Sequence, residues 1–302
     1  MRPTIWLTSY PKSGNTWFRL LLANLGSTRA TPAQINAIDS AETIASSRTV
    51  FDNHALIESG LLSDDEIDDL RPAVYRYLAT DRYTDPFDPE ASYPVRFVKS
   101  HDAYTMTRDG QPVMGAAAAA AGALLFVRDP RDVAPSLANH ASCSIDDAIT
   151  VMSDPAICFG NASNEPGRYY FRQRLLGWSG FAASWLDQTD IPVHLARYED
   201  LHNDALATIR AALGFAGWRV EDAAIERAIR FSAMEEIQRQ EADVGFREAK
   251  AGRRFFRRGV VGGWRDELTD AQCRRIEQDH LVMMQRFGYA PMTAKEAQQN
   301  DQ

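Results

Sequence analysis

Lys99 and His101 stand two positions apart in a short run whose residue types could transfer a proton. The run Val98-Lys99-Ser100-His101 ends an apolar segment that favours a β-strand. Alternate side chains leave the same face of an extended strand, so both groups can address one reacting centre. An imidazole takes up protons near neutral pH, and an ammonium stabilises developing negative charge. The pair predicts a general base beside a cation, with a hydrogen-bonded structural histidine as the alternative.

A candidate anion site lies near the N-terminus, where an apolar strand runs through a turn into an amphipathic helix. The turn is the run Tyr10-Pro11-Lys12-Ser13-Gly14-Asn15-Thr16-Trp17. Unpaired N–H groups and the positive end of the helix dipole favour a phosphate or sulfate at such a turn. Lys12 adds a charge, and Ser13 and Thr16 add hydroxyl donors. The lysine precedes the glycine, so this is not a Walker A loop, and plain helix capping is the alternative.

A second basic run is Phe126-Val127-Arg128-Asp129-Pro130-Arg131-Asp132-Val133-Ala134-Pro135-Ser136. Arg128 ends a predicted strand, and Ser136 lies on the helix that follows. A guanidinium and a hydroxyl placed in this way can bracket one phosphate, which the arginine can bind in bidentate fashion. A surface salt-bridge cluster among the charged residues of the run is the alternative.

A third basic run, Phe255-Phe256-Arg257-Arg258-Gly259-Val260-Val261-Gly262-Gly263-Trp264, follows Arg253 and Arg254. Adjacent arginines repel one another, and the chain as a whole carries a formal net charge of −8. A shared dianion explains why cations gather here, and a solvated basic surface is the alternative.

The three basic runs, in this order, resemble those of sulfotransferases that use 3′-phosphoadenosine 5′-phosphosulfate (PAPS) as donor. The first run is similar to the family's 5′-phosphosulfate loop, and the second to its 3′-phosphate signature. The third looks like the C-terminal loop that closes over the 3′-phosphate, and Lys99 to His101 is similar to the family's Lys-Thr-His. The resemblance covers Ile5 to Phe287.

The resemblance implies in-line transfer of a sulfuryl group to a hydroxyl or amine of a small-molecule or glycan acceptor. By analogy with phosphoryl transfer, His101 is the general base, Lys99 assists at the sulfuryl group and Lys12 at the leaving phosphate. The nucleotide product is 3′,5′-ADP, and no metal is required. The implied donor-binding residues are Lys12, Ser13, Gly14, Asn15, Thr16, Trp17, Arg128, Ser136, Tyr198, Ser232, Met234, Arg257, Arg258 and Gly259.

Three features depart from the family's pattern. Gly263 replaces the aspartate of the usual Gly-Asp-Trp, so whatever that aspartate caps in relatives is absent. Met234 stands where many relatives place a phenylalanine against adenine, and a methionine can still supply an apolar contact. The dimerisation motif of many cytosolic relatives is reduced to Thr269 within Arg265 to Arg274, so the sequence leaves the oligomeric state open.

Short apolar runs alternate with helical patterns, which predicts the fold class α/β with an open parallel sheet flanked by helices. We expect one domain over residues 1–290, and the resemblance implies the P-loop-like sulfotransferase fold. The predicted strands are Thr4 to Thr8, Val95 to Val98, Leu124 to Val127 and Val193 to Ala196. The predicted helices are Thr16 to Leu25, Asp132 to His140, Leu175 to Leu186, Ala205 to Leu213, Ala223 to Phe231 and Asp270 to Phe287.

Polar and turn-rich segments interrupt this pattern. Residues 27–94 and 142–167 are predicted insertions that border the acceptor pocket. The alanine run from Ala116 to Ala121 indicates a short helix or a connector, and we assign it no function. Residues 291–302 form a polar tail that we expect to fray.

Charge and hydropathy limit the partners. A sequence pI near 5.3 disfavours a nucleic-acid partner. No run approaches the ~20 apolar residues of a membrane span, and we expect a cytoplasmic location. Three widely spaced cysteines indicate neither a disulfide framework nor a zinc site.

Two alternative functions come from other classes. A P-loop-like nucleotide kinase would also bind phosphate at a strand-to-helix turn, but the Gly-Lys-Ser/Thr order is missing. A catalytically inactive module that binds PAPS or 3′,5′-ADP would not need Lys12, Lys99 and His101 together.

Overall fold

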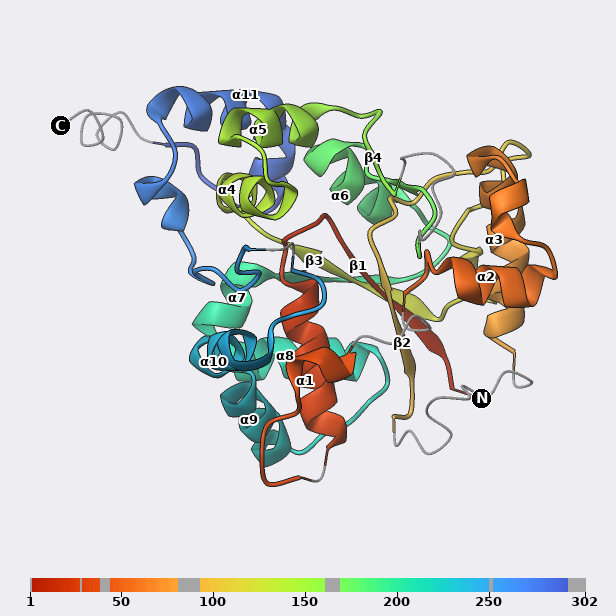
Figure 1. Cartoon of the computed structure of the whole chain (residues 1–302), viewed down its shortest axis with the longest axis horizontal. Coiled ribbons are helices and arrows are strands. Elements are labelled where there is room, and N and C mark those ends of the chain that lie inside the picture. The colour runs from red at the N-terminus through yellow and green to blue at the C-terminus, as the bar shows by residue number, and fades with distance from the viewer. Residues whose placement is uncertain are drawn as a thin grey trace.

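A four-stranded parallel sheet forms the centre of the molecule (Figure 1). The computed structural model of the chain describes residues 2–27, 29–38, 44–80, 93–160, 169–249 and 252–292. The strand order is β2-β1-β3-β6, and each neighbouring pair is parallel. These strands are β1 (Thr4–Ser9), β2 (Arg96–Ser100), β3 (Gly122–Val127) and β6 (Val193–Arg197). The α/β class and the four predicted strands are confirmed, with ends that differ by one or two residues.

The central strands are buried on both faces, which is why they appear in the sequence as continuous apolar runs. In β1, Ile5 and Leu7 pack on one side of the sheet with Phe18. Trp6, which lies between them in the sequence, packs on the other side with Tyr75, whose ring centroid is 5.2 Å away. The alternation places one hydrophobic core on each face of the sheet.

Helices cover both faces, with α1, α8, α9 and α10 on one side in Figure 1 and α4, α5, α6 and α11 on the other. The predicted helices correspond to α1 (Asn15–Gly26), α4 (Pro130–Ala141), α6 (Gly177–Asp187), α8 (Ala205–Phe215), α9 (Asp222–Phe231) and α11 (Asp270–Arg286). The helices that we did not predict are α2 (Arg48–Ala55), α3 (Asp64–Leu78), α5 (Ile145–Ser153), α7 (Tyr198–Asn203) and α10 (Met234–Val244). The alanine run forms a 3-10 turn at Ala116–Ala118 before β3.

The predicted insertions contain regular structure. Residues 27–94 hold α2 and α3, and residues 142–167 hold α5 and the short strand β4 (Cys158–Phe159), which pairs with β5 (Gln173–Arg174). The parts of these segments at 28, 39–43, 81–92 and 161–168 lie outside the described residues, as does the tail from 293 onward.

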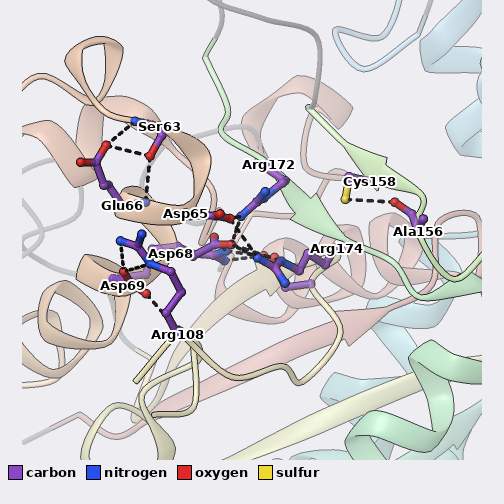
Figure 2. A network of polar contacts seen from close by, with 12 residues as sticks. Ser63, Asp65, Glu66, Asp68, Asp69, Arg108, Ala156, Cys158, Arg172 and Arg174 are labelled. Atoms are coloured by element: carbon purple, nitrogen blue, oxygen red, sulfur yellow. Dashed lines mark hydrogen bonds and ion pairs between the residues drawn. The ribbon is translucent and has the colours of Figure 1, made fainter. Parts of the chain in front are cut away.

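An ion-pair network fixes α3 against β5 and the segment before it (Figure 2). Asp65 and Asp68 of α3 both contact Arg172 and Arg174. Arg108 contacts Asp69 at the outer side of the same helix. The network therefore attaches the first insertion to the chain that leads into α6.

A buried arginine links the ion-pair network of α3 to the chain just after β2. Arg71 of α3 is 1% exposed and donates to Asp68 and, through both terminal nitrogens, to Asp102. The Trp185 indole donates to the Asp102 carbonyl oxygen at 2.9 Å. The residue that follows His101 is thus held from two sides.

The carboxyl ends of the four strands lie at one edge of the sheet, as parallel pairing requires. Lys12, His101, Arg128 and Tyr198 follow β1, β2, β3 and β6, respectively. The strand that follows β1 in the sequence, β2, lies on one side of β1, and the next strand, β3, lies on the other. Ligand sites of open α/β sheets lie at such a reversal of strand order.

Candidate active site

A cleft of about 690 Å³ opens at this edge and collects most of the predicted site residues. Its lining includes Lys12, Gly14, Asn15, Thr16, Trp17, Lys99, His101, Arg128, Ser136, Tyr198, Met234, Arg257, Arg258 and Gly259. Ile44 and Ser46 from the first predicted insertion, and Phe159 and Gly160 from the second, line it as well. Residues predicted to bind the donor and residues of the two predicted insertions therefore line one cavity.

Ser13 and Ser232 are predicted donor contacts that do not line the cleft. Ser13 is 1% exposed, and its hydroxyl has no hydrogen-bond partner among the described residues. Ser232 is fully buried behind the first helix, where its hydroxyl accepts from Asn24 and its carbonyl accepts from the Trp17 indole. Ser232 supports Trp17 from behind, so a direct contact with a donor stays a prediction.

The N-terminal turn is shaped by close packing as well as by its sequence. Gly14 has φ +101°, and a Cβ there would lie 2.8 Å from the Tyr198 ring. Only glycine satisfies both the left-handed backbone and this approach. The Asn15 amide donates to the Leu7 carbonyl at 2.8 Å and ties the first turn of α1 to β1. The result is a rigid helix N-terminus that faces the cleft, as an anion site requires.

The Lys12 ammonium lies over the ring of Phe255, 3.4 Å from its centroid. The pKa of Lys12 is lowered to about 7, chiefly by burial and then by the nearby cations Lys99 and Arg128, against an opposing effect of Glu248. A bound anion would reverse this shift by favouring the charged form. Together with the orphaned Ser13 hydroxyl, the site matches a phosphate or sulfate ligand.

His101 is oriented by the end of β1. Its Nδ1 lies 2.7 Å from the Ser9 carbonyl oxygen, so the neutral ring donates through Nδ1. The lone pair then resides on Nε2. Burial and the charge of Lys99 lower the pKa of His101 to about 3, which keeps the imidazole unprotonated at neutral pH. This is the protonation state that a general base needs.

Glu248, which sequence reasoning missed, places a carboxylate in the cleft next to these cations. It accepts from Lys99 at 3.2 Å and from Arg19 at 2.9 Å. The Thr16 hydroxyl donates to it at 3.4 Å. Although burial acts in the opposite direction, Lys99 and Arg19 lower the pKa of Glu248 to about 2. Its partners are more than 140 positions away in the sequence, so no local pattern points to it.

Arg128 and Tyr198 stack at the other end of the cleft. The Arg128 guanidinium carbon lies 4.4 Å from the centroid of the Tyr198 ring, and one of its nitrogens donates to the Val260 carbonyl at 2.8 Å. The Tyr198 hydroxyl donates to the Gly259 carbonyl at 3.0 Å. The strand ends β3 and β6 are thereby joined to the C-terminal basic loop.

The two arginines of this loop are paired with carboxylates. Arg257 contacts Glu267, and Arg258 contacts Asp266 at 2.7 Å and Glu267 at 3.3 Å. Glu267 itself lines the cleft. The predicted 3′-phosphate ligands are thus present at the cleft, although they contact acidic residues that sequence reasoning did not foresee.

Asp132 of α4 anchors the same loop by its backbone. Its carboxylate accepts from the Gly262 N–H at 2.7 Å and from the Trp264 N–H at 2.8 Å. A Cβ at Gly263 would lie 2.8 Å from a methyl group of Val260. Asp132 of α4 therefore fixes the backbone on both sides of Gly263, the glycine that replaces the aspartate of relatives.

At Gly259 the loop again requires glycine, because φ is +65° and a Cβ would lie 2.1 Å from the end of the Met234 side chain. Met234 lines the cleft at this point. Its position is compatible with the apolar contact that the sequence predicts.

No group of three or more His, Cys, Asp or Glu side chains in the part of the chain that the structure describes is arranged to hold a metal ion. None of the helices in the described ranges is both long enough and apolar enough to cross a membrane.

The fold and cleft define an α/β protein with a cleft lined by lysines and arginines at the carboxyl edge of a parallel sheet. The chain belongs to the sulfotransferase-domain family, whose sequence model matches residues 2–288. Membership supports sulfotransfer in general and confirms the resemblance drawn from the three basic runs. No curated protein matches the sequence.

Solved structures with the same fold include mouse sulfotransferase SULT7A1 complexed with PAP, at 19% identity and a TM-score of 0.56. That match covers 93% of this chain and 84% of the mouse chain. Retinol dehydratase in a complex with retinol and PAP matches at 19% identity and a TM-score of 0.53, over 94% of this chain and 82% of that one. These likenesses confirm the P-loop-like sulfotransferase fold.

Proposed function

We propose that this protein transfers a sulfuryl group from PAPS to a hydroxyl or amine of a small-molecule or glycan acceptor. The observation that carries the proposal is the hydrogen bond from His101 Nδ1 to Ser9, which leaves Nε2 as the base in a cleft that also holds Lys12 and Lys99. Family membership and structures of the same fold with bound PAP support the choice of donor.

In the proposed reaction, His101 takes the acceptor proton while the acceptor oxygen or nitrogen forms a bond to sulfur. The bond between sulfur and the bridging phosphate oxygen breaks, and 3′,5′-ADP leaves with the electron pair. Lys12 stabilises charge on the departing phosphate, and Lys99 stabilises the sulfuryl oxygens. The acceptor proton remains on the imidazole, from which solvent removes it.

The donor would lie with its phosphosulfate at the N-terminal turn and its 3′-phosphate near Arg128, Ser136 and the C-terminal arginines. The backbone N–H groups of α1 and the buried Ser13 hydroxyl favour the first anion. Arg257 and Arg258 would exchange carboxylate contacts for contacts to the 3′-phosphate, which carries more charge and more acceptor oxygens.

The test is transfer of labelled sulfate from PAPS to a panel of hydroxyl and amine acceptors, followed by detection of 3′,5′-ADP. We expect label in at least one acceptor and equal amounts of nucleotide product. Retention of all label in PAPS, in a protein shown to bind 3′,5′-ADP, would favour the inactive binding module. A second assay offers ATP labelled in the γ-phosphate to the same acceptors. Label in an acceptor there would indicate a kinase.

A further inference from the structure

The Glu248 side chain places a negative charge among the cations and hydroxyl donors of the cleft. The Glu248 carboxylate contacts the Thr16 hydroxyl of the N-terminal turn and the Lys99 ammonium at the end of β2. Both partners line the cleft, and both are expected ligands of the donor's phosphosulfate. A carboxylate and a sulfuryl group compete for the same kind of donor, because each offers oxygens with negative charge.

The third partner of Glu248 is of a different kind. Arg19 is 6% exposed, does not line the cleft, and is fixed by a 2.6 Å hydrogen bond to the Ile38 carbonyl. Its 2.9 Å contact joins the Glu248 carboxylate to a residue outside the cleft lining. Glu248 can therefore keep Arg19 as an anchor while it gives up the two contacts that face the cleft.

The backbone next to Glu248 is held in place. Phe246 is buried among the apolar residues beneath the loop, and the Arg247 N–H donates to the Asn36 side chain at 3.0 Å. An exchange of partners at Glu248 thus requires rotation of one side chain and no large movement of the chain.

We propose that Glu248 acts as an internal competitor for the sulfuryl subsite and so distinguishes the donor from the product. This inference rests on the proposed function. When PAPS binds, its sulfuryl oxygens take Lys99 and Thr16, and the carboxylate turns toward Arg19. After transfer the sulfuryl group is gone, so the carboxylate returns to Lys99. Its charge then lies near the 5′-phosphate of 3′,5′-ADP and weakens the binding of the product.

The competing interpretation is that Glu248 is a permanent counterion of Lys99 and Arg19. Buried cations require a nearby anion, and the contacts of Glu248 with Lys99 and Arg19 satisfy that requirement equally well. The two interpretations differ in one measurable respect. A competitor lowers the affinity for the product, whereas a permanent counterion that organises Lys99 raises it or leaves it unchanged.

The decisive experiment compares Glu248→Gln, which keeps the shape and removes the charge, with the wild-type chain in titrations of 3′,5′-ADP and of inorganic sulfate. We expect about a tenfold or larger gain in affinity for 3′,5′-ADP, as removal of a nearby like charge implies, and a gain for sulfate. The matched control is Asp243→Asn, since Asp243 is exposed on α10 and pairs with Arg239. It changes the net charge equally and should leave both affinities unchanged.

Equal or weaker binding of 3′,5′-ADP by Glu248→Gln would overturn the inference. A wild-type chain that fails to bind 3′,5′-ADP at all would instead count against the proposed function. The two failures are thus distinguishable.

A second measurement covers the case in which Glu248→Gln does not fold. Crystal structures of the wild-type chain with PAPS and with 3′,5′-ADP should differ at Glu248. We expect the contact between Lys99 and Glu248 to be broken in the first and present in the second. A contact that persists beside the bound sulfuryl group would show that Glu248 is a permanent counterion.

Discussion

His101 Nδ1 lies 2.7 Å from the carbonyl oxygen of Ser9, the last residue of β1. Because a carbonyl only accepts hydrogen bonds, the contact sets the tautomer of the ring and leaves the lone pair on Nε2. The neighbouring strand thus determines which nitrogen can act as a base. It links the pairing of β1 and β2 directly to the proposed chemistry.

His101→Ala should lower the turnover of labelled PAPS by about 10²–10⁴-fold, the usual contribution of a general base. The affinity for 3′,5′-ADP should stay close to that of the wild type, because the imidazole is not an expected nucleotide ligand. His54→Ala is a suitable control, since His54 does not line the cleft. Retention of most activity in His101→Ala would place the base elsewhere.

The value of kcat/KM should fall on the acid side only at a pH well below the usual histidine pKa of ~6.5. Burial and Lys99 lower the pKa of His101 to about 3, so the free enzyme keeps its base down to acidic pH. Negative charge of a bound nucleotide should raise that pKa. NMR titration of labelled histidine should show the His101 resonance titrating at higher pH with 3′,5′-ADP than without it. A His101 resonance that titrates near pH 6.5 in the protein without nucleotide would show that burial and Lys99 do not lower the pKa of His101.

Much of the fold could be predicted because buried parallel strands leave an apolar signal in the sequence. The helix α3 could have been found as well. Ser63 accepts from the Glu66 N–H while the Glu66 side chain accepts from Ser63, a capping box that is visible as Ser-x-x-Glu. The acidic run Ser63-Asp64-Asp65-Glu66 belongs to a segment that we predict as an insertion, and in the structure it forms this cap and the first turn of α3. A capping box of the same kind begins α5 inside the second predicted insertion.

The site was predictable only where its residues form local runs. Lys12, Arg128 and His101 each follow a strand, and the sheet brings strand ends together. The carboxylate that contacts the N-terminal run comes from a distant segment. Glu248 contacts Thr16 across 232 positions, and such a contact depends on the complete fold. The contact of Arg71 with Asp102 is of the same kind.

Binding of 3′,5′-ADP at pH 8 should be accompanied by uptake of about one proton at Lys12. The pKa of Lys12 is about 7 because of burial and neighbouring cations, so without nucleotide the amine is mostly neutral at this pH. The 5′-phosphate favours the charged form and raises the pKa above 8. Uptake should disappear near pH 6, where the amine is protonated in both states.

The proton count comes from calorimetric titrations in buffers of different ionisation enthalpy. Lys12→Arg provides the control, since arginine is charged throughout and should take up no proton at this position. Proton uptake in Lys12→Arg equal to that in the wild type would assign the uptake to another group.

The product 3′,5′-ADP should raise the melting temperature more than 5′-AMP at equal concentration, because a ligand of the native state stabilises it by mass action. Arg257→Ala should reduce the difference between the nucleotides, whereas Arg274→Ala, on the exposed side of α11, should preserve it. Equal shifts by the two nucleotides in the wild-type chain would show that the 3′-phosphate is not recognised.

Arg71→Met should destabilise the chain by about 3–5 kcal/mol, the usual result of removing one partner of a buried ion pair. Asp102 would be left buried without its cation, since the guanidinium that contacts it through both terminal nitrogens is 1% exposed. Arg108→Met provides the matched control, because Arg108 pairs with Asp69 at the outer, exposed side of the same helix and its loss should have little effect (Figure 2). Urea denaturation followed by circular dichroism compares the two variants. Equal urea midpoints for the two variants would show that the buried Arg71 contacts contribute no more to the free energy of unfolding than the exposed Arg108 contact.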